Sequence, residues 1–114
     1  MKRDIWVYLD DIFESIERIE EYIKGKSKDD FVKDVLLQDA IIRRFAIIGE
    51  AIKQIPKDVK SQHPEINWRE IAAMRNILIH EYFGIAFDRL WKAIVEDMPV
   101  FRDRMKNLSK TLRN

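Results

Sequence analysis

The sequence of 114 residues lacks cysteine, has only three glycines and three prolines, and shows no surplus of one charge. Without cysteine, the chain cannot hold a disulfide framework, a thiolate zinc site or a cysteine nucleophile. Its 21 Lys and Arg residues balance 20 Asp and Glu residues. The balance argues against the strongly basic coat of many nucleic-acid-binding proteins and leaves room only for a local basic cleft.

Long apolar runs are also missing. The start "MKRDIWVYLDD" turns acidic too early for a signal peptide, and no run approaches the length of a membrane span. We therefore expect a cytoplasmic protein without a membrane partner. A composition of 46% hydrophobic and 36% charged residues is typical of a folded chain, and the length predicts a single domain over residues 1–114.

Apolar residues recur at alternating steps of four and three, which is the period of a helix packed on one side. This spacing predicts a first helix over residues 5–23, capped by Asp4 and followed by Gly25 in a left-handed conformation. A last helix follows Gly84 and continues to Leu112.

The middle of the chain is predicted to form one long helix from Ser27, its N-cap, to Pro56. Its apolar stripe, which includes Val35 and Leu36, is too wide for one neighbour, so we expect this helix to be central. Gly49 lies inside it and costs about 1 kcal/mol relative to alanine. A close approach of another helix would explain this glycine.

A polar connection with one short helical turn follows Pro56, and "NWRE", residues 67–70, is a capping sequence before a third helix that Gly84 closes. Pro99 should bend the last helix near Val95. No strand-like alternation appears. The sequence predicts an all-α, up-and-down bundle of four main helices with one or two short extra turns.

The stretch "MRNILIHEYFG", residues 74–84, gathers Arg75, Asn76, His80 and Tyr82. On a helix, Asn76 and His80 are neighbours one turn apart, and Ala72 and Ile79 lie between the polar residues. An isoleucine exposed among these polar residues indicates a subunit interface. The same pattern also fits an ordinary helix end, with a surface arginine and a histidine favoured by the helix dipole.

RNA phosphodiester cleavage is a chemistry that these groups fit without a metal. His80, with an ordinary pKa near ~6.5, can transfer protons at neutral pH. Arg75 can stabilise charge on the scissile phosphate, and Asn76 can orient the histidine or hold a phosphate oxygen. One histidine cannot easily act as both base and acid, so a two-fold dimer would supply a second pair.

The chain resembles the HEPN superfamily, and within it the HepT-like toxins that pair with MntA-like nucleotidyltransferase antitoxins. The segments that carry the resemblance are "RDIWVYLDDIFESIERIEEYI", "RRFAIIGEAIKQIP", "INWREIAAMRNILIHEYFGI" and "LWKAIVEDMPVF". The motif of the family is Arg, a polar residue, a short spacer and His. It falls on Arg75, Asn76 and His80, and the toxin branch adds a tyrosine at Tyr82.

The resemblance implies a homodimeric helical bundle and a metal-independent endoribonuclease, the toxin of a type VII-like toxin–antitoxin pair. It places catalysis on Arg75 and His80, with Asn76 in support. It makes Tyr82 the acceptor of AMP from the antitoxin, and a bulky anionic nucleotide there would block RNA.

Two alternatives remain open: a non-catalytic module that binds a nucleotide or a nucleotidyltransferase, and a plain dimerisation bundle. Glu50 is interpreted as a salt-bridge or capping residue and His63 as structural or incidental. The tryptophans at helical spacing are interpreted as packing residues. No histidine has metal-ligand spacing, and no cofactor is expected.

Overall fold

The computed structural model describes residues 4–80 and 85–113, and it describes side chains outside residues 77–80 and 85–86. The described residues form helices and no strand. The elements are α1 (Ile5–Ile23), α2 (Lys28–Lys33), α3 (Val35–Gln54), α4 (Lys57–Gln62), α5 (Trp68–His80), α6 (Ile85–Lys92), the π-helical turn η1 (Ala93–Asp97) and α7 (Met98–Arg113). The predicted all-α fold is confirmed.

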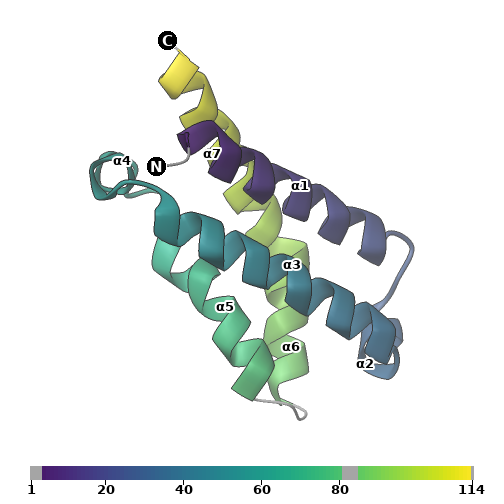
Figure 1. Ribbon diagram of the computed structural model, residues 1–114. Helices are drawn as coiled ribbons and strands as arrows, with labels where there is room; N and C mark the ends of the chain where they lie inside the picture. The colour runs from purple at the N-terminus through teal and green to yellow at the C-terminus, as the bar shows by residue number, and fades with distance from the viewer. Residues whose placement is uncertain (1–3, 81–84, 114) are drawn as a thin grey trace.

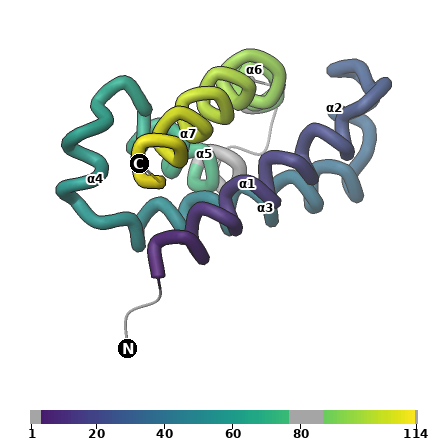
Figure 2. The backbone as a smooth tube through the Cα atoms, turned by 90° about the horizontal axis from the view of Figure 1, so that it is seen from above, coloured from purple at the N-terminus to yellow at the C-terminus, as the bar shows by residue number. Residues whose placement is uncertain are grey.

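Helix α3 lies at the centre of the bundle, between α1 and α5 (Figure 1). The continuous segment α6–η1–α7 covers one side of the α1–α3 pair (Figure 2), with α6 against α2 and α5 and α7 against α1. The main helices are therefore α1, α3, α5 and α6–α7, and α2 and α4 are the short additions. This is the predicted bundle, with the predicted helix in the central place.

The core is built from the apolar stripes of all the main helices. Its fully buried large side chains include Leu9, Ile12, Ile16, Ile19, Phe31, Ile41, Phe45, Ile48, Ile94, Met98 and Phe101. Phe31 of α2 meets Phe87 edge-on and Trp91 at a tilt, with ring centroids 5.7 Å apart in both pairs. Trp6, Trp68 and Trp91 are partly buried against this core, which confirms that they are packing residues.

The predicted caps at Asp4, Gly25 and Ser27 are present. The carboxylate of Asp4 accepts a hydrogen bond from the Trp6 amide at 3.2 Å, and Gly25 has a φ of 72°. Ser27 and Asp30 form a reciprocal capping box at the start of α2. The hydrogen bond from the Ser27 amide holds the pKa of the Asp30 carboxyl below its ordinary value.

The prediction of one unbroken helix from Ser27 to Pro56 is wrong. Asp34 adopts an extended backbone, with φ −108° and ψ 97°, and its carboxylate caps α3 by accepting from the Leu37 amide at 3.1 Å. Gln38 of α3 donates to the Phe31 and Val32 carbonyls at the end of α2. These side-chain hydrogen bonds replace the backbone bonds lost at the break.

The apolar stripe that was assigned to the long helix is also narrower than predicted. Val35 and Leu36 are 66% and 79% exposed, because the break at Asp34 starts α3 with these side chains outside the core. Leu112, placed in the stripe of the last helix, is 36% exposed. The continuous core of α7 ends at Leu108.

Pro99 disturbs the last helix at the predicted place. The π-helical turn η1 contains Val95, and the Met98 amide donates to the Ala93 carbonyl five residues earlier. A proline cannot donate to the carbonyl four residues before it, and its ring crowds that carbonyl. The wider turn accommodates this while α6 and α7 remain continuous.

At the start of α5, Asn67 and Glu70 contact each other through their side chains, with Asn67 Nδ2 donating to Glu70 Oε2 at 3.2 Å. The short helical turn expected after Pro56 is α4. Gly84, expected to close the third helix, lies outside the described residues.

Gly49 provides a test of the packing between α3 and α5. A Cβ built there would lie 3.5 Å from the Ala72 carbonyl oxygen, an ordinary contact. We predict that Gly49→Ala raises the free energy of unfolding by up to about 1 kcal/mol through helix propensity. Gly49→Leu should lower it by about 1–3 kcal/mol through overpacking. Urea unfolding would measure both, and a destabilised alanine variant would contradict the described spacing.

Candidate functional site

Arg75 lies on α5 at the edge that faces α3. Its Nη1 atom is 3.8 Å from Oε1 of Glu50, and the two side chains are 41% and 61% exposed. The same carboxylate oxygen lies 3.6 Å from Lys53 Nζ. Glu50 is thus a salt-bridge residue, as interpreted from the sequence. These long, exposed ion pairs hold the arginine loosely.

The buried residues of α5 fix the position of the Arg75 backbone. Ile71 and Met74 are buried, and Ala72 packs beside Gly49 of α3. The backbone of Ala72 therefore lies against α3. The glycine–alanine contact brings the two helix backbones close enough for Arg75 to reach Glu50.

The remaining residues of the motif are described in part. The Asn76 side chain is exposed. Because α5 continues to His80, the backbone places His80 one turn after Asn76. The side chains of His80 and Ile79 and the whole of Tyr82 lie outside the described residues. The structure therefore brings Arg75 and Asn76 onto neighbouring parts of one helix.

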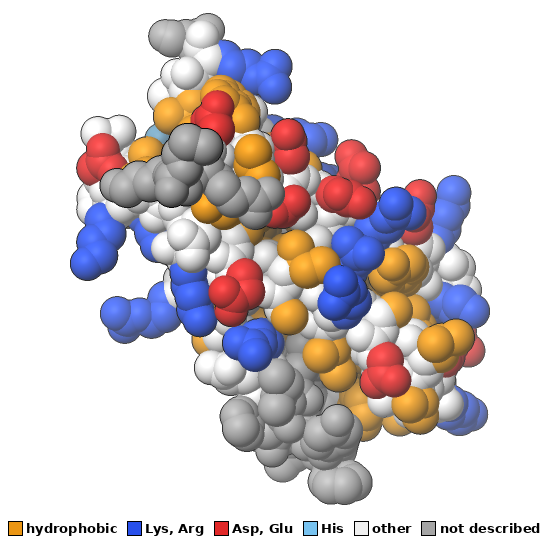
Figure 3. Space-filling view, in the orientation of Figure 1, with side chains coloured by type: hydrophobic (Ala, Val, Ile, Leu, Met, Phe, Trp, Pro, Cys, Tyr) orange, Lys and Arg blue, Asp and Glu red, His pale blue; other side chains and the backbone are white. Residues whose placement is uncertain are grey.

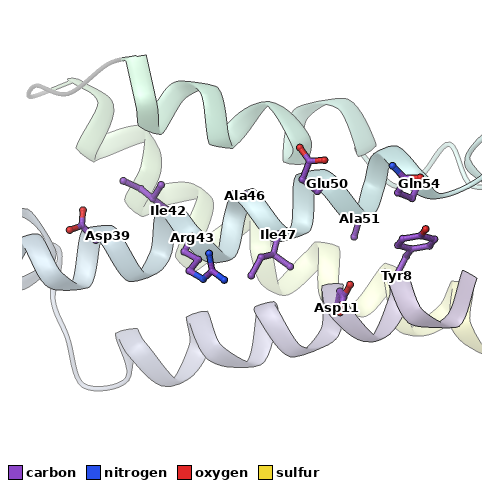
Figure 4. A pocket seen from close by; sticks show the side chains of 10 residues that line it. All are labelled: Tyr8, Asp11, Asp39, Ile42, Arg43, Ala46, Ile47, Glu50, Ala51 and Gln54. Atoms are coloured by element: carbon purple, nitrogen blue, oxygen red, sulfur yellow. The ribbon is translucent and has the colours of Figure 1, made fainter. Parts of the chain in front are cut away.

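A groove of about 780 Å³ lies between α1 and α3, beside the Arg75–Glu50 pair (Figure 4). Its lining residues are Tyr8, Asp11, Asp39, Ile42, Arg43, Ala46, Ile47, Glu50, Ala51 and Gln54. Sequence reasoning missed this groove, since it depends on how α1 packs on α3. With three carboxylates and one arginine, the groove is a poor place for an RNA phosphate.

The surface shown in Figure 3 mixes apolar side chains with both signs of charge. Apolar side chains also gather at the end of this face formed by α2 and the start of α3, where Val32, Val35 and Leu36 are exposed. Contiguous exposed apolar surface of this kind is typical of a contact with another protein.

His63 stands in the loop before α5 and has structural contacts. Its Nδ1 atom is 3.0 Å from Glu65 Oε2, and its carbonyl accepts from Trp68 Nε1 at 3.2 Å. Hydrogen bonds from its own backbone amide and from His63 hold the pKa of Glu65 below its ordinary value. These contacts agree with a structural role for His63.

Among the side chains that the structure describes, those of residues 4–76 and 87–113, no group of three or more His, Cys, Asp or Glu is placed to hold a metal ion. In the same part of the chain, every helix is too short or too polar to cross a membrane.

The described residues form an all-α bundle, and the match to a family model identifies it as a bundle of the HEPN type. The sequence profile of the family described as "Ribonuclease HepT-like" matches residues 12–108, and the chain belongs to this family. At the level of the family, this is an enzyme of the ribonuclease class.

Several relatives of the chain are named as ribonucleases. "Probable ribonuclease HepT" of Thermococcus cleftensis is 49% identical over 110 residues, which are 96% of this chain and 100% of that protein. "Putative RNase TTE0752" of Caldanaerobacter subterraneus subsp. tengcongensis is 42% identical over 101 residues, 89% of this chain and 90% of that protein.

One relative is longer. "Gamma-glutamylcyclotransferase and putative RNase MJ0434" of Methanocaldococcus jannaschii is 44% identical over 112 residues, which cover 98% of this chain. The chain spans half the length of that protein. No solved structure matches the chain at a significant level.

The exposure of Arg75 predicts how its removal affects stability. Arg75→Ala should change the free energy of unfolding by less than about 1 kcal/mol, because exposed ion pairs contribute little. Arg102 provides a matched control, since it is less exposed and joins α7 to Glu20 of α1. Arg102→Ala should lower the urea midpoint more than Arg75→Ala does. A larger loss in Arg75→Ala would mean that the arginine has mainly a structural role.

Proposed function

We propose that this chain is a metal-independent endoribonuclease and the toxin of a toxin–antitoxin pair. The observation that carries the proposal is the position of Arg75. It lies on α5 beside Asn76, half exposed, and forms a long ion pair to Glu50. Membership of the HepT-like family supports the ribonuclease class.

In the proposed reaction, the 2′-hydroxyl of RNA attacks the adjacent phosphorus. Its proton passes to a neutral His80, and the bond to the 5′ oxygen breaks. A protonated histidine gives that oxygen its proton, which leaves a 2′,3′-cyclic phosphate and a free 5′-hydroxyl. Arg75 stabilises the charge on the phosphate oxygens, and Asn76 orients the histidine or holds one oxygen.

Two histidines serve this scheme better than one. A homodimer that joins two copies of α5 at one cleft would provide the base from one protomer and the acid from its partner. DNA, which lacks the 2′-hydroxyl, should resist cleavage. The loose Glu50 contact suits this role, because a phosphate can replace it at little cost.

Control of the enzyme is proposed to rest on Tyr82. An MntA-like nucleotidyltransferase antitoxin would transfer AMP from ATP to the phenol oxygen and release pyrophosphate. The added phosphate would compete with RNA for Arg75, and the nucleotide would fill the cleft. The resemblance to the toxin branch of the family carries this part of the proposal.

The second candidate is a non-catalytic module that binds a nucleotide or a nucleotidyltransferase. The exposed apolar side chains Val32, Val35 and Leu36 at one end of the bundle favour a protein-binding role.

Replacement of the histidine tests catalysis. His80→Ala should lower cleavage of single-stranded RNA, measured with excess chelator, by at least about 100-fold, since general acid–base catalysis contributes that much. The matched control is His63→Gln, which changes the other histidine of the chain and should leave cleavage unchanged. Full activity in His80→Ala would contradict the catalytic assignment, and a parent protein without activity would favour the binding module.

The mass of the intact protein tests the control mechanism. After co-expression with the cognate nucleotidyltransferase, the parent should gain mass in multiples of AMP and lose RNA cleavage. Tyr82→Phe should show no gain. Tyr22→Phe, which changes a partly buried tyrosine of α1, should still gain the mass. Modification that persists in Tyr82→Phe would place the acceptor elsewhere.

A further inference from the structure

We propose that the outer face of α3 pairs with the same face of a second copy, about a two-fold axis between Ala46 and Ile47. We infer further that this pairing moves Glu50 from Arg75 to Arg43 of the partner subunit. The consequence for catalysis rests on the proposed function. The outer face is defined here by Asp39, Arg43, Ala46, Ile47, Glu50 and Gln54.

The outer face has a sequence that is complementary to itself. An isologous contact between antiparallel helices joins residues that lie at equal distances on either side of the axis. About a midpoint between Ala46 and Ile47, Arg43 meets Glu50 of the partner subunit. Asp39 likewise meets the partner's Gln54. Each copy thus offers a cation where the other has an anion, and an amide where the other has a carboxylate.

These residues also share one side of the helix. At about 100° per residue, Arg43 and Glu50 are two turns apart and almost in line, with the other four within about 50° of them. Asp39, Arg43, Glu50 and Gln54 are exposed, whereas Ala46 and Ile47 between them are half-buried. Small and apolar residues at the axis with charged groups on either side form the usual anatomy of a protein interface.

The outer face is open on the molecule. All six of its residues line the open groove between α1 and α3, where Figure 4 shows their side chains. Arg43 forms no ion pair with any of the residues that the structure describes. Leu36, 79% exposed, lies on the same side of α3 two turns before Arg43 and extends the apolar part of the contact.

The Glu50 carboxylate can form a closer ion pair than the ones it has in the single copy. Its Oε1 atom takes both long contacts, from Lys53 at 3.6 Å and from Arg75 at 3.8 Å. An arginine can bind both oxygens of a carboxylate side by side, and such a bidentate pair is stronger than a single long contact. The partner's Arg43 would therefore draw Glu50 away and leave the Arg75 guanidinium available for a phosphate.

The same axis would bring the two sites together. Glu50 lies three to four residues from the midpoint, so the two copies of Glu50 would be about 10 Å apart along the helix direction. The two Arg75 residues, each on the α5 that packs beside its own α3, would lie on either side of the axis. A cleft formed in this way has an arginine from each copy.

Charge exchange tests the interface. Arg43→Glu should place like charges opposite each other twice in the dimer and raise its dissociation constant at least about tenfold. Glu50→Arg should do the same. A mixture of the two variants restores both pairs in a one-to-one heterodimer, so its dissociation constant should return to within about threefold of the parent. Sedimentation equilibrium measures these constants, and circular dichroism checks helicity.

Matched controls and a second variant complete the test. Arg89→Glu on α6 and Glu17→Arg on α1 make the same charge changes at exposed positions off the outer face and should leave the dissociation constant unchanged. The double variant R43E/E50R should dimerise as the parent does. A parent that is monomeric at all concentrations, single variants as tight as the parent, or a mixture that stays monomeric would each overturn the interface.

A separate measurement tests whether Glu50 moves from Arg75 to the partner's Arg43. The Nε–Hε resonance of Arg75, assigned by its loss in Arg75→Lys, should shift as the concentration of the parent crosses the dimer dissociation constant. In Arg43→Glu over the same range it should stay in place. A dimer that forms without this shift would overturn the exchange. Neither measurement uses RNA, so a correctly paired dimer that cuts no RNA would contradict only the ribonuclease proposal.

Discussion

The packing of α3 between α1 and α5 is the contact on which the rest of the structure depends. Ile41, Phe45, Ile48 and Ile52 of α3 are buried in the core, and Gly49 lets the backbone of α5 approach. With its flanks and its inner side occupied, α3 has one side left for solvent. That side carries the charged residues of the groove, including the carboxylate that holds Arg75.

The same packing explains the character of the candidate site. Arg75 is neither buried nor free: α5 fixes its backbone through Ile71 and Met74, while its guanidinium makes a long contact to Glu50. A buried partner would hold the arginine too strongly to exchange for a phosphate. An arginine without a partner would lose more side-chain entropy on binding. The position combines a rigid backbone with a replaceable ion pair.

Sequence periodicity predicted the main helices well because each has a regular apolar stripe and several have clear caps. It failed at Asp34, where a local side-chain hydrogen bond to Leu37 interrupts an apolar pattern that would otherwise continue. Periodicity also cannot distinguish a core position from an apolar residue on an exposed surface, so Val35 and Leu36 were assigned to the core. Both errors arise because the apolar pattern of a sequence does not show which residues are neighbours in the folded chain.

For the site, chemistry and helical spacing predicted roles for Arg75, Asn76 and His80, and the resemblance to a family added the role of Tyr82. The structure describes the arginine and the asparagine, and it adds the ion-pair geometry between Arg75 and Glu50. The groove between α1 and α3 could not be predicted, because Tyr8 and Glu50 are distant in sequence and line one groove only once the helices pack. The roles of His80 and Tyr82 stay predictions.

The π-helical turn at Ala93–Asp97 sets which sides of α6 and α7 face the rest of the bundle. A turn with one additional residue rotates everything after it by about 100° relative to a regular helix. The apolar side of α6 can therefore face α2 and α5, while that of α7 faces α1. One residue more or fewer in this turn would move Met105 and Leu108 away from the core. The irregular turn is what allows a single continuous helix to join both ends of the bundle.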